Sequence, residues 1–498
     1  MTVLHGLYSA SEVRAIEQAA LAAVSPGALM RRAGAAAAAL AGRLLRAGGK
    51  VLVLAGPGNN GGDALETAAL LAHGGYRVSV HFFGDAGSLP ADAAAALQRA
   101  MASPAVFDAA DMAAHWDLAI DGLFGIGLAR PVTGQLATLV LGLNALHSPV
   151  LALDVPSGLN ADTGAVVGPG GVAVRASHTL TFIADKPGLH TADGRDHAGL
   201  VEVATLGVAA ALAPPPSAVL AEPALFAACL APRRQNSHKG SFGDCAILGG
   251  AHSMAGAAIL AARSAAMAGA GRVYAGFIDA PPAYDPLHPE IMCRRAADLD
   301  LARAAVVAGP GMGTGADAHA LLAQALASAA PLVLDADALN MVAADTGLRA
   351  GLASRTAATL MTPHPLEAAR LLGRSAADVQ ADRLAAARSL AASFDAMVVL
   401  KGAGSVMARP DGFVVINTSG NPALATAGTG DVLAGLCGAL LAQQWPAWEA
   451  LLGAVWLHGA GADLLVAQDV GPVGLVASEL PAAIRSCLNR LIRSQSGY

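Results

Sequence analysis

A glycine-rich turn, Ala427-Gly428-Thr429-Gly430, precedes an expected helix over Val432–Gln443 and is the stretch best suited to chemistry. Such a turn directs several backbone N–H groups at one point, where the helix dipole also favours negative charge. The pattern therefore predicts an anion-binding site. Asp431 stands at its edge, either as a proton acceptor or as an ordinary N-cap for the first helical turn.

Polar residues also follow three expected strands in the first half of the chain. Lys50–Ala55 leads into the loop Gly56–Asp63 (GPGNNGGD), Trp116–Asp121 ends on a carboxylate, and Pro149–Val155 carries Asp154 near its end. Ligands of doubly wound sheets bind beyond the carboxyl ends of the strands. The loop lacks the GxGxxG spacing, so the dinucleotide fingerprint does not apply, and an ordinary turn remains the alternative.

Alternating strands and helices position these residues in both halves. A capping box over Ser9–Glu12 predicts a first helix, and the helix after the GPGNNGGD loop is expected over Ala64–Ala72. In the second half, short apolar strands are expected at Cys245–Leu248 and Arg303–Gly309, and a hairpin should reverse at Asp411-Gly412. The fold class is α/β, with two doubly wound domains.

The domain boundary is predicted at a proline-rich stretch. Ala213-Pro-Pro-Pro-Ser217 reads as a stiff spacer, which gives a domain over 1–212, a linker over 213–220 and a second domain over 221–498. The length of 498 residues is enough for two large domains, each with a full core. Aromatic residues are only 4% of the chain, so the packing must rely on Ala, Val and Leu.

Composition argues against several classes of protein. The net charge of −6, without a basic run, makes nucleic acid or an anionic membrane an unlikely partner. Five scattered cysteines form no CxxC motif, which speaks against a disulfide framework and structural zinc. The mean hydropathy is +0.51, yet the apolar runs are short, and the N-terminus has no signal-peptide pattern. A soluble cytoplasmic protein is expected.

At this point both halves resemble known families. The first half, with GPGNNGGD, LAIDGLFGIGL and LALDVPSGLNADTG in that order, resembles the NAD(P)H-hydrate epimerase domain. The second half, with HKGSFGD, GPGMG, LDADALN, LMTPHPLEAARLLG, VVLKGAGSV and NPALATAGTGDVLAG, resembles the ADP/ATP-dependent NAD(P)H-hydrate dehydratases. This resemblance implies a Rossmann-like first domain, a ribokinase-like second domain, and repair of NADH and NADPH that carry water on the nicotinamide ring.

The resemblance assigns roles in the dehydratase half. Asp431 is implied to be the base that accepts the hydroxyl proton, with ADP as co-substrate and Mg²⁺ as the expected metal. Residues implied to line the hydrated dinucleotide are Ala257, Gly311, Gly313, His364 and Asp431. Residues implied to line the ADP site are Lys401, Gly402, Ala403, Gly404, Ser405 and Gly430.

The epimerase half receives its roles in the same way. Asp154 is the implied acid/base group, and K⁺ is implied at Asn60, Asp121 and Ser157. The implied cradle for the hydrates NADHX and NADPHX comprises Asn59, Asn60, Gly61, Gly62, Asp63, Gly125, Ile126, Gly127, Leu128, Ala129, Arg130, Pro131 and Asp154. One departure is Ala64-Leu65-Glu66, since the family loop usually continues with Gly, and Glu66 adds negative charge close to the site unless it points away.

Plainer alternatives remain for single residues. Lys401 could be a solvent-exposed lysine at a strand end, and His364 a turn histidine bonded to the backbone. Asp335 and Asp337 could cap the next helix and orient the site. Lys239 could reach a phosphate or lie on the surface.

Two other functions also remain open. One is a ribokinase-like small-molecule kinase with an appended nucleotide-binding domain, and the other is a noncatalytic nucleotide-sensing scaffold. The choice of ADP or ATP, the choice of NADH or NADPH hydrate, and assembly into homo-oligomers are not determined by the sequence.

Overall fold

The computed structural model describes residues 5–496, so the outermost residues of the two predicted domains lie outside it. The chain forms two compact units, His5–Val219 and a second one from Leu220 onward. The division falls inside the expected linker, where Ala218–Leu220 forms strand β9. This strand pairs antiparallel with β1 (Gly6–Leu7), so part of the expected spacer is a strand.

The N-terminal unit is built on a seven-stranded sheet in the order β4-β3-β2-β5-β6-β7-β8, with every pair parallel. Its strands are β2 (Lys50–Ala55), β3 (Arg77–Phe82), β4 (Val106–Phe107), β5 (Leu118–Gly122), β6 (Val150–Leu153), β7 (His178–Phe182) and β8 (Leu200–Ala204). The strand order reverses between β2 and β5. This is the point at which doubly wound sheets bind ligands.

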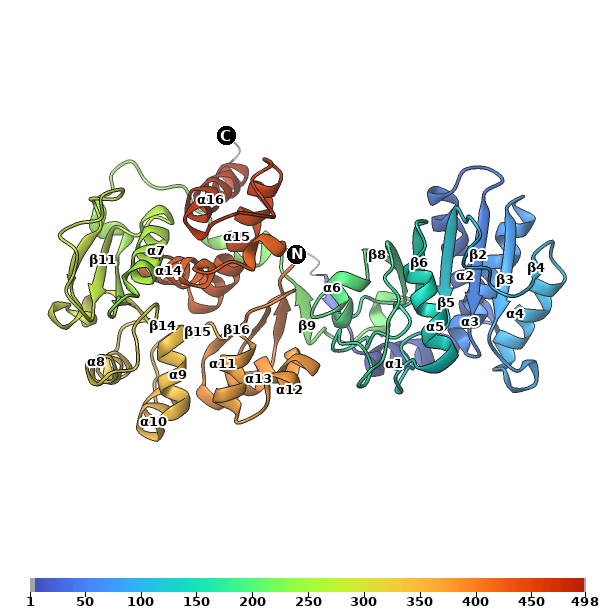
Figure 1. Cartoon of the computed structure of the whole chain (residues 1–498), viewed down its shortest axis with the longest axis horizontal. Coiled ribbons are helices and arrows are strands. Elements are labelled where there is room, and N and C mark those ends of the chain that lie inside the picture. The colour runs from blue at the N-terminus through green and yellow to red at the C-terminus, as the bar shows by residue number, and fades with distance from the viewer. Residues whose placement is uncertain (1–4, 497–498) are drawn as a thin grey trace. The chain divides into compact units, whose positions relative to one another are not determined.

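Helices cover both faces of this sheet (Figure 1). The helices are α1 (Ala10–Leu21), α2 (Ala28–Leu44), α3 (Asn59–His73), α4 (Ala91–Met101), α5 (Gly134–Asn144) and α6 (Gly194–His197). One core packs α2, α3 and α4 against alternate strand residues such as Val51 and Val53, and another packs α5 against Leu52 and Leu54. Successive strand residues enter different cores because side chains along a strand point alternately to the two faces of the sheet.

The predicted capping box is confirmed, whereas the predicted start of the third helix is wrong. Ser9 caps α1, and its backbone N–H donates to Glu12 at 2.7 Å. Helix α3 begins at Asn59 rather than at Ala64, so most of the expected loop is helical. Glycine allows this early start because a Cβ on Gly61 would lie 1.9 Å from the carbonyl oxygen of Gly56.

The C-terminal unit has a mixed sheet in the order β18-β17-β16-β15-β14-β13-β10-β11-β12. Its strands are β10 (Asp244–Gly249), β11 (Arg272–Phe277), β12 (Met292–Arg295), β13 (Ala305–Ala308), β14 (Leu332–Leu334), β15 (Thr359–Met361), β16 (Met397–Leu400), β17 (Val406–Ala408) and β18 (Val414–Ile416). Strands β10 to β16 run parallel, and β17 and β18 form the predicted hairpin, with Gly412 at φ 88°.

The helices of this unit are α7 (Ala255–Met267), α8 (Ala316–Ala327), α9 (Ala336–Ala344), α10 (Thr346–Ala353), α11 (Pro365–Leu372), α12 (Ala376–Ala381), α13 (Arg383–Phe394), α14 (Thr429–Ala442), α15 (Ala447–Val466) and α16 (Leu480–Ser496). Helices α7, α14, α15 and α16 group on one side of the sheet (Figure 1). Helix α14 begins at Thr429, three residues earlier than expected, so Asp431 lies in its first turn.

Helix α15 is long and apolar. Among the described residues it alone is long and apolar enough to cross a membrane by those two measures. Its most apolar window is 67% buried inside the unit, where the helix packs against α14 and α16. Buried core helices of folded domains meet the same two criteria.

Candidate active sites

A cavity of about 840 Å³ opens beyond the carboxyl ends of β2 and β5 in the N-terminal unit. The predicted residues that line it are Asn59, Asn60, Asp63, the whole loop 125–131 and Asp154. Gly61 and Gly62 do not line the cavity. They pack against Gly56 and Met30 respectively, which a Cβ on either glycine would strike. Their role in the structure is to let α3 pack closely.

Asp154 connects two walls of this cavity. Its backbone is left-handed, with φ of 65°, which is uncommon for a residue other than glycine. The N–H of Ile126 donates to its Oδ2 at 3.2 Å, and the amine of Lys186 donates to its Oδ1 at 2.6 Å. The carboxylate is therefore held in one orientation at the edge of the cavity.

Lys186 is a residue of this site that the sequence did not reveal. Its side chain is fully buried and also donates to the Thr181 hydroxyl at 2.7 Å and to the Phe182 carbonyl at 2.9 Å. All three of its protons are thus directed at fixed oxygens. It was missed because it stands in a loop, 32 residues from Asp154, in a segment without a recognisable motif.

Two of the other carboxyl groups that line the cavity with Asp154 have raised pKa values. Burial raises the pKa of Asp63 well above its usual value, and the charges of Asp154, Glu17 and Glu66 raise it further. Burial and Asp154 likewise raise the pKa of Glu17, a residue of α1 that lines the cavity. The pocket therefore contains two carboxyl groups that hold a proton more readily than usual, which suits acid/base chemistry.

Of the residues implied to hold K⁺, Asn60 lines the cavity, and Asp121 and Ser157 are bonded to its lining residues Leu123 and Phe124. Asp121 is fully buried and accepts hydrogen bonds from the Ser157 hydroxyl at 2.6 Å and the Ser157 N–H at 2.8 Å. Burial raises the pKa of Asp121 to about 6. Asn60 packs on the loop after β5, and neither polar atom of its buried amide has a partner among the described residues. An unpaired buried amide beside oxygen-rich groups fits a large monovalent cation.

Glu66 points away from the cavity, so its carboxylate does not add negative charge to the cavity wall. Its carboxylate accepts from the Nε of Arg99 on α4 at 2.8 Å, and its Cβ packs against Gly34 of α2. The side chain of Glu66 is 6% exposed. Its role is to join α3 to the neighbouring helices, although its charge is still felt at Asp63.

We expect Glu66→Gln to lower the stability of the N-terminal unit without slowing the epimerisation that the resemblance implies. The Arg99–Glu66 ion pair is partly exposed, so its loss should cost about 1–2 kcal/mol. Thermal unfolding and the epimerase rate check this. A threefold change in rate corresponds to less than about 1 kcal/mol. A larger loss of rate would mean that Glu66 acts on the site directly.

In the C-terminal unit, Asp431 does not cap its helix. Gly428, at φ 89°, occupies the N-cap position, and no side-chain hydrogen bond caps α14 in the described structure. Burial raises the pKa of Asp431 to about 6, with Asp335 adding to the rise and Lys401 opposing it. Of the two roles left open by the sequence, the geometry excludes the plain cap.

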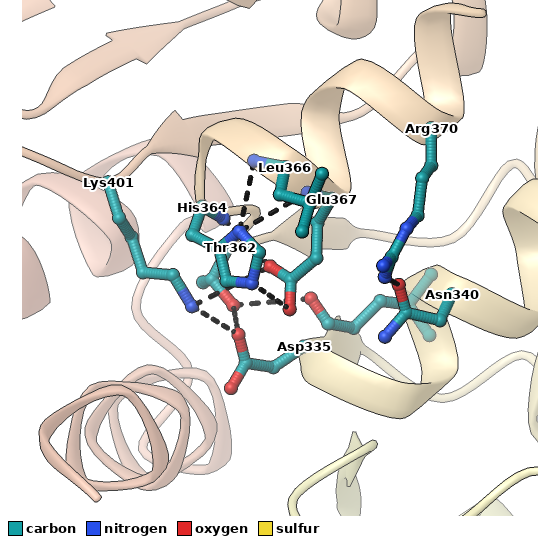
Figure 2. A network of polar contacts seen from close by, with 9 residues as sticks. Asp335, Asn340, Thr362, His364, Leu366, Glu367, Arg370 and Lys401 are labelled. Atoms are coloured by element: carbon teal, nitrogen blue, oxygen red, sulfur yellow. Dashed lines mark hydrogen bonds and ion pairs between the residues drawn. The ribbon is translucent and has the colours of Figure 1, made fainter. Parts of the chain in front are cut away.

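Lys401 belongs to a charged network just beyond the carboxyl ends of β14, β15 and β16 (Figure 2). Its amine lies 2.7 Å from Asp335 Oδ1, and the Thr362 hydroxyl donates to the same oxygen at 2.7 Å. Burial alone would lower the pKa of Lys401, but Asp335 and Glu367 outweigh it and raise the value. A Cβ on Gly430 would lie 3.4 Å from the Lys401 amine, so the anion-binding turn faces this network.

Asp335 and Asp337 orient groups around the site rather than cap a helix. Asp335 occupies the N-cap position of α9 but makes no side-chain cap bond there. Asp337 accepts the N–H of Gly313 at 2.8 Å. A Cβ on Gly311 would lie 3.1 Å from the Cβ of Ala257, so these implied dinucleotide residues lie together beyond β10 and β13.

His364 has the backbone bonding of a turn histidine. Its Nδ1 accepts the N–H groups of Leu366 and Glu367 at 3.1 and 3.2 Å, and its Nε2 lies 3.2 Å from Glu367 Oε1 (Figure 2). Burial lowers the pKa of His364 and raises that of Glu367. The side chain of His364 is still 45% exposed, so its free edge remains accessible. Glu367, only 4% exposed, was not singled out by its sequence position.

The implied nucleotide loop follows β16 directly. Gly402 has φ of 146°, and the Ser405 hydroxyl donates to the Gly402 carbonyl at 3.0 Å, which closes a tight turn around Ala403 and Gly404. Beneath it lies Arg383, only 1% exposed, whose guanidinium would collide with a Cβ on Gly402. Lys239, by contrast, is exposed and lies at the amino ends of β10 and β11, away from this edge.

Comparisons with known proteins match the two units to two different families. The family model described as NAD(P)H-hydrate dehydratase matches residues 245–485, and that of the YjeF-related protein N-terminus matches residues 26–188. The bifunctional NAD(P)H-hydrate repair enzyme Nnr of Coxiella burnetii is 36% identical, with 98% of this chain and 100% of that protein covered.

Two further proteins are similar to the second half. The ADP-dependent (S)-NAD(P)H-hydrate dehydratase of Neisseria meningitidis is 46% identical over 53% of this chain and 90% of its own length. The structure of the ADP/ATP-dependent NAD(P)H-hydrate dehydratase of Bacillus subtilis, co-crystallised with ATP and Mg²⁺, is 31% identical, with a TM-score of 0.48 over 55% of this chain and 98% of that one. From the near full-length match, the chain belongs to the bifunctional NAD(P)H-hydrate repair enzymes.

Proposed function

We propose that this chain returns hydrated NADH and NADPH to use in two steps. The N-terminal unit interconverts the R and S hydrates, and the C-terminal unit removes water from the S form at the expense of ADP, which yields AMP and phosphate. We assign the first activity to residues 1–212 and the second to residues 221–498. Because the dehydratase accepts only the S hydrate, the R hydrate must first be converted by the epimerase, which explains why one chain contains both activities.

In the dehydratase step, the ring hydroxyl is first made a better leaving group. Asp431 takes the hydroxyl proton while the hydroxyl oxygen attacks the β-phosphorus of ADP, so that an O–P bond forms and AMP leaves. Phosphate then leaves the ring carbon with help from the ring nitrogen, and loss of a proton from the neighbouring carbon restores the double bond. The N–H groups of Gly428, Thr429 and Gly430 hold the transferred phosphoryl group.

One observation carries this proposal: Asp431 is a desolvated carboxylate beside the first-turn N–H groups of α14 and the amine of Lys401. A capping aspartate would be engaged by its own helix. A carboxylate with a pKa near 6 and no capping role is ready to accept a proton at neutral pH. Lys401 and the loop 402–405 receive ADP, and Ala257, Gly311, Gly313 and His364 receive the dinucleotide.

In the epimerase step, Asp154 moves the proton that inversion at the hydroxyl-bearing carbon requires. The cavity walls formed by Asn59, Asn60, Asp63 and the loop 125–131 hold the dinucleotide around it. Lys186 keeps the Asp154 carboxylate oriented, since it is bonded to the oxygen that Ile126 leaves free. K⁺ would offset the charge of Asp121 and give the Asn60 amide oxygen a partner, with Ser157 as the third ligand.

Mg²⁺ would enter the second site with the nucleotide, held mainly by phosphates and water. We also propose a cytoplasmic location, because all five cysteines are free thiols, as expected of a reducing compartment. Small molecules are the proposed partners, rather than nucleic acid or membrane, and homo-oligomers are compatible with the proposal.

Recovery of reduced-nicotinamide absorbance from a mixture of both hydrates tests the function. With ADP, Mg²⁺ and K⁺, we expect complete recovery, whereas an inactive first unit would stop the recovery at about one half. Replacing K⁺ with a large organic cation should slow only the second half of the recovery. A stable phosphorylated product, with no return of absorbance, would contradict the proposal in favour of a kinase.

A matched variant tests the cation site without relying on activity. K⁺ should raise the melting temperature of the N-terminal unit, and Asn60→Leu should abolish this shift. Because the variant removes a buried amide without partners, we expect it to be about 1–3 kcal/mol more stable than the wild type in the absence of K⁺. An unchanged K⁺ shift in Asn60→Leu would exclude Asn60 as a ligand.

A further inference from the structure

Helix α15 supports the anion-binding segment from behind, at both of its ends. The Asp463 carboxylate accepts the Gly420 N–H and the Asn421 side-chain amide, each at 2.8 Å. The Ser419 hydroxyl donates to the Trp456 carbonyl at 2.8 Å. At the other end of the segment, the ring of His458 lies 2.9 Å from the Thr429 carbonyl oxygen.

The protonation state of His458 follows from its surroundings. His458 is 8% exposed, and burial lowers its pKa to about 4, although the bond to Thr429 opposes this shift. The ring is therefore neutral near pH 7. Since a carbonyl oxygen can only accept, the single ring proton must be on Nε2.

This bond controls the direction of one N–H group in the site. The carbonyl of Thr429 and the N–H of Gly430 belong to the same planar trans peptide and point in opposite directions. Because this peptide already belongs to the first turn of α14, the His458 donor on the carbonyl holds the direction of the Gly430 N–H more firmly and increases its polarity. A Cβ on Gly430 would lie 3.4 Å from the Lys401 amine and 3.9 Å from Asp335 Oδ2, so this residue borders the charged network.

We propose that His458 is a positioning residue of the dehydratase site, and that it holds the Thr429–Gly430 peptide so that the Gly430 N–H meets the transferred phosphoryl group. This rests on the function proposed for the C-terminal unit. His458 itself touches no reacting atom. Its effect should appear in the rate of phosphoryl transfer rather than in the affinity for the dinucleotide, because the developing charge is greatest in the transition state.

Three substitutions separate this role from simple packing. In His458→Gln the amide nitrogen can reach the position of the ring Nε2, whereas in His458→Asn it is too short, and His458→Leu has no donor. We expect His458→Gln to retain kcat within about threefold of the wild type. His458→Asn and His458→Leu should lose about 10- to 100-fold in kcat, the lower range for weakening one oxyanion-type donor, with little change in the KM for the hydrate.

Equal losses in the Gln and Asn variants, or wild-type kcat in both Asn and Leu variants, would overturn the proposal. If His458→Leu does not fold, the comparison of Gln with Asn still decides the question. The epimerase activity of the same chain gives the concentration of the chain in each sample, and thermal unfolding of the C-terminal unit shows whether that unit is folded. Wild-type turnover in Asp431→Asn would instead contradict the assignment of the site itself, whatever the His458 variants do.

Discussion

Asp431→Asn is expected to lower dehydratase turnover by about 10²- to 10⁴-fold, the usual contribution of a general base, while epimerisation continues at its normal rate. The amide keeps the shape of the carboxylate but cannot accept a proton. Because Asp431 makes no capping bond, loss of helix stability cannot explain such a result. Single-turnover measurements with the S hydrate and ADP check it.

Asp345→Asn provides a matched control for this experiment. Asp345 is a true N-cap, since it accepts the Leu348 N–H at 2.8 Å at the start of α10, and its side chain is 41% exposed. Its replacement should leave turnover unchanged and lower stability by about 1 kcal/mol or less. If both variants keep full turnover, Asp431 is not the general base, and the mechanism proposed for the dehydratase is wrong.

The pH dependence of turnover should report the same carboxylate. Asp431 acts in its ionised form, so turnover should fall about tenfold per pH unit below its pKa of about 6. The effect on stability has the opposite sign. The pKa is raised from 3.8 in the unfolded chain to about 6 in the folded one, so stability falls as the pH rises through this window.

Asp431→Asn should therefore raise the melting temperature of the C-terminal unit above pH 6, by a few degrees, and this gain should shrink toward pH 4. A capping aspartate would show the reverse, because its replacement removes a stabilising bond. Thermal scans at several pH values distinguish these outcomes without any substrate.

Lys186→Met is expected to reduce epimerisation by about 10²-fold or more, with the dehydratase unaffected. Methionine preserves most of the side-chain volume but removes the amine that holds Asp154 Oδ1. Asp154 would then face the carboxyl groups of Asp63 and Glu17 without the amine that is bonded to it, and its orientation would be lost. The rate of interconversion of purified R and S hydrates measures the effect.

Lys50→Met serves as the control, because Lys50 is exposed at the opposite end of β2. If Lys186→Met folds poorly, Asp154→Asn tests the same pair while the amine keeps Thr181 and Phe182 as partners. A wild-type epimerisation rate in a folded Lys186→Met or Asp154→Asn protein would contradict the role proposed for this ion pair.

The sequence was sufficient to place most predicted site residues at the carboxyl edges of two sheets. Apolar runs such as Lys50–Ala55 and Met397–Leu400 predict parallel strands, and the residue that follows each strand must appear at one edge. Asp335 and Lys401 directly follow β14 and β16, and Asp121 is the last but one residue of β5. These features depend on neighbouring residues along the chain, so a local pattern is enough to predict them.

Contacts between distant segments were settled by the fold alone. Lys186 meets Asp154 across 32 residues, His458 meets Thr429 across 29, and Glu66 turns to Arg99 across 33. No local periodicity specifies which buried polar group will meet which, because the partners are chosen by how helices and strands pack. The start of α3 at Asn59 has the same origin, since close packing of Gly61 on Gly56 extends the helix into a stretch whose composition is typical of a loop.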